Sequence, residues 1–230
     1  MNAHRPAVRA LVFDLDGTLI DSAPDIHHAA NRLMAELKLP AFDLTTITSY
    51  IGNGIPVLVE RCLQAAGDAG RGVALDDAIA RFKSFYAEEP ALRTRPYSGV
   101  EDALATWAAA GSGLGVVTNK AEDLSRAALR DLGLAGHFAT VIGGDTLATK
   151  KPDPQGLLLA IEQLGATPEA ALYVGDSEVD AETAANAGVR FALFSGGYRK
   201  APLSQLPHWR AFDDMRELMA MVDIAGAPHG

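Results

Sequence analysis

The sequence predicts an α/β protein in which a doubly wound parallel sheet carries an inserted all-helical domain. Three observations predict this class. Short apolar segments alternate with helical patterns along most of the 230-residue chain, which is typical of a parallel sheet. One interval between two of these segments is much longer than a crossover helix requires. That interval contains helical patterns and no strand pattern.

Five apolar segments are expected to form the strands of a Rossmann-like sheet, because each is short and rich in β-forming residues. They span residues 8–13, 114–118, 140–142, 171–174 and 191–194. Helical patterns separate most of these segments, so the strands are expected to run parallel, with helices on both faces of the sheet.

The long interval lies between the first two of these strands. Its last part, residues 98–110, suffices for the crossover helix, which is expected to begin at a capping box formed by residues 98–101. Earlier helical patterns occupy residues 24–37, 56–66 and 76–87. We therefore predict a helical domain of residues 22–96 and a core domain of residues 1–21 and 97–230.

Composition restricts the classes of partner. The net charge is −9 and no run of lysine and arginine is present, which argues against binding to nucleic acid or to an anionic membrane surface. No uninterrupted apolar segment is long enough to cross a membrane. Cys62 is the single cysteine, so an intrachain disulfide is excluded and a cytoplasmic location is expected. A monomer and a homodimer both remain open.

Two carboxylates follow the first predicted strand. Asp14 and Asp16 are two residues apart, so they are expected to project to the same side, and Gly17 allows the chain to turn sharply after them. Two carboxylates this close repel each other unless one is protonated or a cation lies between them. Mg²⁺ is the natural cation, because it is hard and prefers oxygen ligands. The alternative for an isolated pair is an ordinary turn.

Polar residues also follow the other predicted strands, in the order Thr118, Asn119, Lys151, Asp176 and Asp180. Ligands of open α/β sheets bind beyond the carboxyl ends of the strands. Acids, a hydroxyl and a lysine are what metal-assisted phosphoryl transfer requires. Each residue alone also fits a helix cap or a solvated loop, but the ordered set favours a phosphate site.

The motifs resemble those of the haloacid dehalogenase-like hydrolases. Residues 14–18, Asp-Leu-Asp-Gly-Thr, match the first motif of that family, Thr118 the second, Lys151 the third and residues 175–180 the fourth. The resemblance covers the whole chain, including a helical cap domain inserted after the first motif. Residues 50–56 and 194–199 are also similar to the branch of the family that hydrolyses 2-phosphoglycolate.

The resemblance implies a role for each motif residue. Asp14 would attack phosphorus and form an aspartyl-phosphate, and Asp16 would protonate the leaving alkoxide and then deprotonate the attacking water. Thr118 and the backbone of Asn119 would bind the phosphate, with Lys151 balancing its charge. Asp16 also argues against dehalogenase activity, because the dehalogenases of the family lack this acid.

The resemblance also implies Mg²⁺ as the cofactor. Asp14, the carbonyl of Asp16 and Asp176 would hold the ion, and Asp180 would act nearby through water or by orienting Lys151.

The segment Gly52-Asn53-Gly54 precedes a helix that is expected to start near Pro56. Helix N-termini present free N–H groups and a partial positive charge, two glycines allow close approach, and the Asn53 side chain can add a donor. The resemblance places a specificity loop here, so these three residues are expected to bind the substrate's carboxylate. The alternative is a Gly-Asn-Gly turn that only caps the helix.

The leading functional hypothesis is a Mg²⁺-dependent phosphatase that hydrolyses 2-phosphoglycolate, a small-molecule phosphate monoester, through an aspartyl-phosphate. A phosphomutase or a phosphatase acting on a small sugar phosphate is the first alternative. A non-catalytic phosphate-sensing protein is the second, because a fold does not by itself establish a function.

Overall fold

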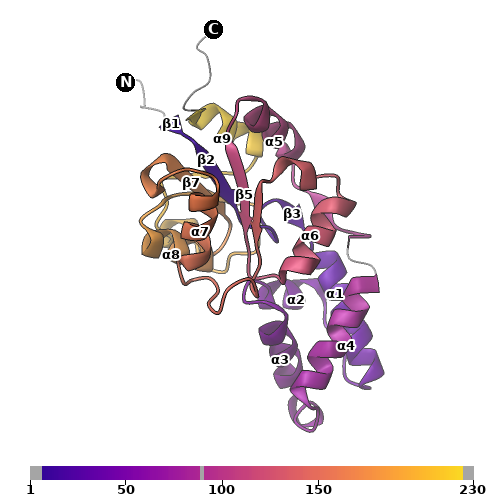
Figure 1. Cartoon of the computed structure of the whole chain (residues 1–230). Coiled ribbons are helices and arrows are strands. Elements are labelled where there is room, and N and C mark those ends of the chain that lie inside the picture. Colours follow the sequence, from indigo (N-terminus) through magenta and orange to yellow (C-terminus); the bar gives the residue numbers. More distant parts are fainter. Residues whose placement is uncertain (1–6, 89–90, 225–230) are drawn as a thin grey trace.

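The computed structural model describes residues 7–88 and 91–224 of the chain. Its centre is a six-stranded sheet of order β6-β5-β2-β7-β8-β9 in which every pair of neighbours is parallel. The strands are β2 (Ala10–Phe13), β5 (Gly113–Val117), β6 (Thr140–Ile142), β7 (Ala171–Gly175), β8 (Arg190–Phe194) and β9 (Arg210–Phe212). The predicted α/β class with a parallel sheet is confirmed, and the five predicted strands are all present (Figure 1).

Helices cover both faces of the sheet, because successive strand residues point to opposite sides. Leu11 and Phe13 pack in one apolar cluster with α5 (Val100–Ala109), α6 (Glu122–Asp131) and α9 (Met215–Met221). Ala10 and Val12 pack in a second cluster with α7 (Gln155–Gln163) and α8 (Glu178–Ala187). The sheet is therefore buried on both sides, which explains why its strands are almost uniformly apolar.

Four helices lie between β2 and α5, beyond the carboxyl ends of the strands (Figure 1). We refer to them as the helical insertion: α1 (Ala23–Glu36), α2 (Leu44–Tyr50), α3 (Ile55–Ala65) and α4 (Leu75–Glu88). They share an apolar cluster of their own, which includes Leu33, Val59 and Phe82. The insertion begins and ends at a short antiparallel ribbon of β3 (Ile20–Asp21) and β4 (Arg95–Pro96). The domain boundaries at residues 21–22 and 96–97 stay predictions.

The remaining elements are short. Strands β1 (Ala7–Val8) and β10 (Asp223–Ile224) pair in parallel. The 3-10 turns are η1 (Gly67–Ala69), η2 (Ala135–His137), η3 (Pro168–Ala170) and η4 (Leu203–Gln205).

The expected capping box at residues 98–101 is wrong. Helix α5 begins at Val100, and its N-cap is Gly99 in the left-handed region at φ 77°, with no side-chain cap hydrogen bond. The Ser98 hydroxyl donates instead to Asp214 Oδ2 at 2.8 Å. A tertiary partner therefore replaces the local cap. A capping box does occur in α8, where Ser177 and Asp180 bond each other's backbone.

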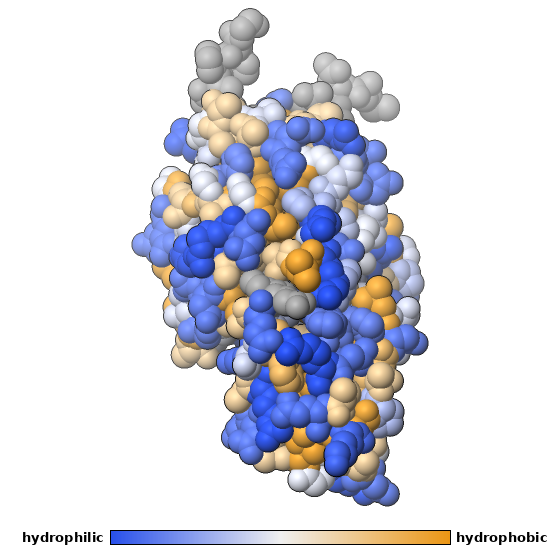
Figure 2. Space-filling model, turned by 90° about the vertical axis from the view of Figure 1, so that its right-hand side faces the viewer, coloured by the Kyte–Doolittle hydropathy of each residue, from blue (hydrophilic) through white to orange (hydrophobic). Residues whose placement is uncertain are grey.

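The surface seen in Figure 2 is largely hydrophilic, with scattered hydrophobic residues. The large hydrophobic side chains that are exposed lie apart in the sequence, and Leu92 is the most open of them at 58%. Among the helices in the described ranges, none combines the length and the apolar character needed to cross a lipid bilayer.

Candidate active site

Three buried aspartates meet at the carboxyl end of the sheet. Asp14 follows β2, Asp176 follows β7 and Asp180 lies in the first turn of α8, and one oxygen atom of each lies within 4.8 Å of the others. The backbone at Gly17 passes so close to Asp176 that a Cβ there would lie 2.6 Å from Asp176 Oδ2. The φ of Gly17 is +91°, which also favours glycine. The Thr18 hydroxyl donates to Asp176 Oδ1 at 2.8 Å. The sequence-predicted metal residues thus converge, except for the side chain of Asp16.

Lys151 supplies a positive charge inside this cluster. Its Nζ lies 2.9 Å from Asp14 Oδ1 and 2.7 Å from Asp180 Oδ1, and its side chain is only 3% exposed. Asp180 Oδ1 also accepts from the Tyr173 hydroxyl at 2.8 Å, and Asp180 Oδ2 accepts from the Ser177 hydroxyl at 2.6 Å. With both oxygens engaged, Asp180 holds Lys151 in place.

Burial and mutual repulsion shift the protonation of the cluster. Burial raises the pKa of Asp14 to about 7, while Lys151 opposes this rise and Asp180 adds to it. Burial and the charges of Asp180 and Asp14 raise the pKa of Asp176 well above its usual range. Burial also acts to raise the pKa of Asp180, but the charge and hydrogen bond of Lys151 outweigh it and lower that pKa. One ammonium among three carboxylates leaves a deficit of positive charge, and the hard oxygen donors fit a divalent cation.

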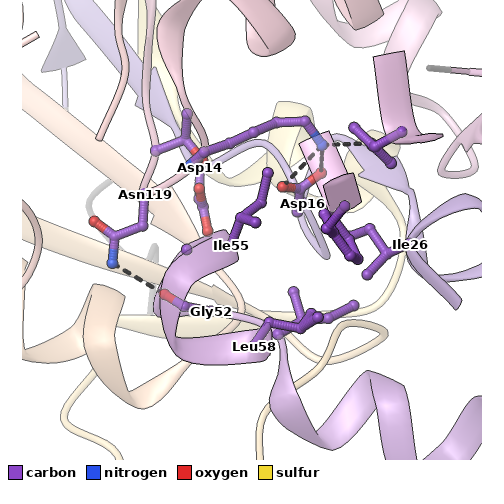
Figure 3. A pocket seen from close by; sticks show the side chains of 13 residues that line it. Asp14, Asp16, Ile26, Gly52, Ile55, Leu58 and Asn119 are labelled. Carbon is purple, nitrogen blue, oxygen red and sulfur yellow. Dashed lines mark hydrogen bonds and ion pairs between the residues drawn. The ribbon is translucent and has the colours of Figure 1, made fainter. Parts of the chain in front are cut away.

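The Asp16 carboxylate has separate partners. Its Oδ1 lies 2.9 Å from Lys120 Nζ and accepts from the Ser22 hydroxyl at 2.6 Å, and its Oδ2 lies 3.3 Å from the same Nζ. Strand β2 ends at Phe13, so the alternation expected for Asp14 and Asp16 does not extend to this side chain. Both aspartates nevertheless line one cavity (Figure 3).

Lys120 and Tyr86 are components of the site to which the sequence analysis assigned no role. Lys120 Nζ donates to the Tyr86 hydroxyl at 2.7 Å and lies 4.6 Å from the centre of the Tyr86 ring. Burial acts to lower the pKa of Lys120, but Asp16 and Tyr86 outweigh it and raise that pKa, so the side chain stays charged. The available signal was its position, since Lys120 follows Thr118 and Asn119 at the end of a strand.

The cavity lies between the sheet and the helical insertion, and we call it the site cavity. Figure 3 shows Gly52 and Leu58 across the cavity from Asp14 and Asp16. Its wall on the insertion side is mostly apolar: Ile26, Ile51, Ile55, Leu58 and Phe82. Thr118 and Asn119 also line the site cavity, and their role in binding phosphate stays a prediction.

The predicted specificity loop borders the site cavity through its glycines. Gly52 accepts a hydrogen bond from Asn119 Nδ2 at 2.9 Å, and Gly54 is the N-cap of α3 at φ 85°, with no side-chain cap. The amide oxygen of Asn53 accepts from the Arg61 guanidinium at 3.0 Å. The structure thus brings Gly52 and Gly54 to the site cavity, whereas the Asn53 amide oxygen is held by Arg61.

Comparisons of sequence and of structure with known proteins point to one family. The family model of haloacid dehalogenase-like hydrolases matches residues 11–194. A phosphoglycolate phosphatase of Cereibacter sphaeroides (strain ATCC 17029 / ATH 2.4.9) is 47% identical over 208 residues, which covers 90% of this chain and 94% of the relative. One of Thiobacillus denitrificans is 40% identical over 220 residues, covering 95% and 97%. A crystal structure described as a predicted phosphoglycolate phosphatase from Haemophilus somnus superposes with a TM-score of 0.88 at 29% identity, covering 93% and 97%.

Proposed function

The chain belongs to the haloacid dehalogenase-like hydrolases, and on this premise we propose that it is a Mg²⁺-dependent phosphatase that hydrolyses 2-phosphoglycolate to glycolate and phosphate. The observation that carries the proposal is the meeting of Asp14, Asp176 and Lys151 beside a cavity that Asp16 and Thr118 also line. Relatives named phosphoglycolate phosphatase at 40–47% identity support the substrate.

In the first half of the reaction, a carboxylate oxygen of Asp14 attacks phosphorus and the bond between phosphorus and the ester oxygen breaks. Asp16 gives its proton to the departing alkoxide, so glycolate leaves and an aspartyl-phosphate remains. Thr118, the Asn119 backbone and Lys151 bind the phosphoryl oxygens and balance their charge.

In the second half, Asp16 takes a proton from water as the water oxygen attacks the same phosphorus atom. The bond between Asp14 and phosphorus breaks, which releases phosphate and restores both carboxyl groups. Asp14, the Asp16 carbonyl and Asp176 would hold Mg²⁺, which would neutralise charge on the phosphate. Asp180 orients Lys151, with which it forms a 2.7 Å ion pair.

The helical insertion is proposed to act as a cap domain of residues 22–96 that excludes water from the site cavity. Gly52, Asn53 and Gly54 are proposed to adjoin the carboxylate end of the substrate, chiefly through their backbone, because Arg61 holds the Asn53 amide oxygen. A cytoplasmic location and a monomeric or homodimeric state complete the proposal.

A sugar-phosphate mutase or phosphatase is less well supported. A phosphosugar carries several hydroxyl groups, and buried hydroxyls need hydrogen-bond partners. The insertion wall of the site cavity offers mostly isoleucine, leucine and phenylalanine side chains. A short leaving group without further hydroxyl groups leaves fewer polar atoms unpaired at this wall.

The test is phosphate release from 2-phosphoglycolate, a hexose phosphate and p-nitrophenyl phosphate, with chelated enzyme and with added Mg²⁺ or Ca²⁺. We expect turnover only with Mg²⁺ and fastest on 2-phosphoglycolate, because the larger and looser shell of Ca²⁺ misplaces the carboxylates. Full activity after exhaustive chelation would contradict the metal assignment. Faster hydrolysis of the hexose phosphate would contradict the substrate, and no turnover of any ester would favour a non-catalytic sensor.

A further inference from the structure

The site cavity contains one cationic side chain to which the proposed mechanism gives no part. Among the thirteen described residues that line it, Lys120 is the only lysine or arginine. Its side chain is 4% exposed. Burying an ammonium group is costly unless it is paired, so a lysine at this position calls for a partner or a ligand.

The hydrogen bonds of the Lys120 ammonium group go to two side chains, and two of them go to one carboxylate. An ammonium group has three donors. In the described ranges, the hydrogen bonds of Nζ go to the Asp16 carboxylate, at 2.9 and 3.3 Å, and to the Tyr86 hydroxyl, at 2.7 Å. The contact with Asp16 Oδ2 is the longest of the three, at 3.3 Å, and it is the one that an acceptor in the site cavity would replace.

The position of Lys120 relative to Asp16 determines which part of a substrate it meets. The general acid must lie within about 3 Å of the leaving-group oxygen to transfer its proton. Lys120 Nζ lies 2.9 Å from that same carboxylate. A leaving-group oxygen that takes a proton from Asp16 would therefore lie close to the ammonium, and a group one carbon from that oxygen would come within reach of Nζ.

We infer that Lys120 binds the carboxylate of the leaving group and so selects phosphate esters that carry an acid one carbon from the ester oxygen. This inference rests on the proposed function and identifies the residue that recognises the acid. Lys120 carries a full charge, whereas the N-terminus of α3 at Gly54 offers only the partial charge of a helix end. Hydrogen bonds to charged groups are the stronger kind.

Tyr86 acts as a positioning residue in this scheme. It belongs to α4 of the helical insertion, is 2% exposed, and directs its hydroxyl and its ring at Lys120. The insertion therefore sets the direction of the ammonium group from across the site cavity.

The experiment compares kcat/KM for 2-phosphoglycolate with kcat/KM for ethyl phosphate, which has a methyl group in place of the carboxylate. In Lys120→Met we expect the ratio of the two values to fall by about 10- to 100-fold, the range for one hydrogen bond to a charged group. Lys120 also contacts Asp16, so its substitution is expected to lower kcat/KM for both substrates. The ratio of the two values, and not either value alone, therefore reports recognition of the carboxylate. Lys83→Met, an exposed lysine of α4, is the matched control and should keep the ratio.

Two further variants keep the inference testable if Lys120→Met does not fold. Lys120→Gln keeps a donor for Asp16 and loses the charge, so it should lose the preference as well. Tyr86→Phe removes the hydroxyl and keeps the ring, and should lower the ratio less. Circular dichroism reports whether each variant is folded.

The inference is overturned if the ratio is unchanged in folded Lys120→Gln or Lys120→Met, whatever the loss on both substrates. It is also overturned if the ratio survives these changes and collapses in Gly54→Ala, since the loop would then recognise the acid. Failure of the proposed function looks different, because wild-type enzyme would then not prefer 2-phosphoglycolate at all.

Discussion

Asp14 should make the metal-free protein less stable as the pH rises, although it is ion-paired with Lys151, because burial outweighs that pairing. Burial raises the pKa of its carboxyl group from the ordinary 3.8 to about 7 in the folded protein. The folded state therefore holds this proton more tightly than the unfolded state. The resulting stability is fully present below about pH 4 and is lost as the pH rises through about 7.

The size of the effect follows from the displacement of this pKa. At about 1.36 kcal/mol for each pKa unit, a rise from 3.8 to about 7 corresponds to about 4 kcal/mol over the whole range. Between about pH 5 and pH 8 the loss is about 2–3 kcal/mol. Other carboxylates also titrate, such as Asp25, whose pKa is lowered, so the effect has to be isolated with a variant.

Asp14→Asn provides that comparison, because asparagine resembles the protonated acid and cannot ionise. We expect the free energy of unfolding of wild type, measured by urea denaturation in the presence of EDTA, to fall relative to Asp14→Asn by about 2–3 kcal/mol from pH 5 to pH 8. Saturating Mg²⁺ should reverse this fall for wild type, since the ion compensates the ionised cluster. A difference between the two proteins that does not change with pH would refute the argument.

Four further substitutions test the assigned roles. Asp16→Asn should lower kcat on 2-phosphoglycolate by about 10²–10⁴-fold, and by less on p-nitrophenyl phosphate, whose leaving group needs no proton; equal losses would argue against the acid role. Lys151→Met should abolish turnover and reduce the free energy of unfolding in EDTA by about 3–5 kcal/mol, because it leaves buried carboxylates unpaired; a change below 1 kcal/mol in urea denaturation would contradict this. Gly54→Ala should lower kcat/KM for 2-phosphoglycolate more than for ethyl phosphate, since the φ of Gly54 is +85° and the new Cβ would lie 3.0 Å from the Asn119 carbonyl oxygen. Asn53→Ala should have the smaller effect. A larger effect of Asn53→Ala would indicate that the Asn53 amide contacts the substrate directly.

The convergence of Asp14, Thr118, Lys151 and Asp176 could be predicted from the sequence because it depends only on the order of the strands. Each residue follows a short apolar strand or the loop after it, and the carboxyl ends of parallel strands lie at one edge of the sheet. Local pattern and topology together were sufficient: Asp14, Lys151 and Asp176 meet in one cluster, and Thr118 lines the site cavity together with Asp14.

The environment of Lys120 could not be predicted in this way. Its ion pair with Asp16 joins residues 104 positions apart, and its contact with Tyr86 depends on how the helical insertion packs over the sheet. Helix α2 was missed because Leu44–Tyr50 has a weak apolar period. Strand β9 was missed because its sequence, Arg-Ala-Phe, begins with a charged residue and has a single large apolar side chain. At Ser98, a tertiary hydrogen bond outweighed the local capping signal.

The β3–β4 ribbon has a consequence for how the chain assembles. Phe13 of β2 and Val116 of β5 are register partners, although the helical insertion separates them in the sequence. The pairing of Asp21 with Arg95 brings the two ends of the helical insertion together. The effective connection between β2 and β5 is therefore short, although many residues separate these strands in the sequence. The entropy of joining these strands then depends little on what lies between them, because closure entropy grows slowly with loop length and contacts of low separation form fastest. Residues can therefore be added to or removed from the helices above the site without changing the register of the strands that carry its carboxylates.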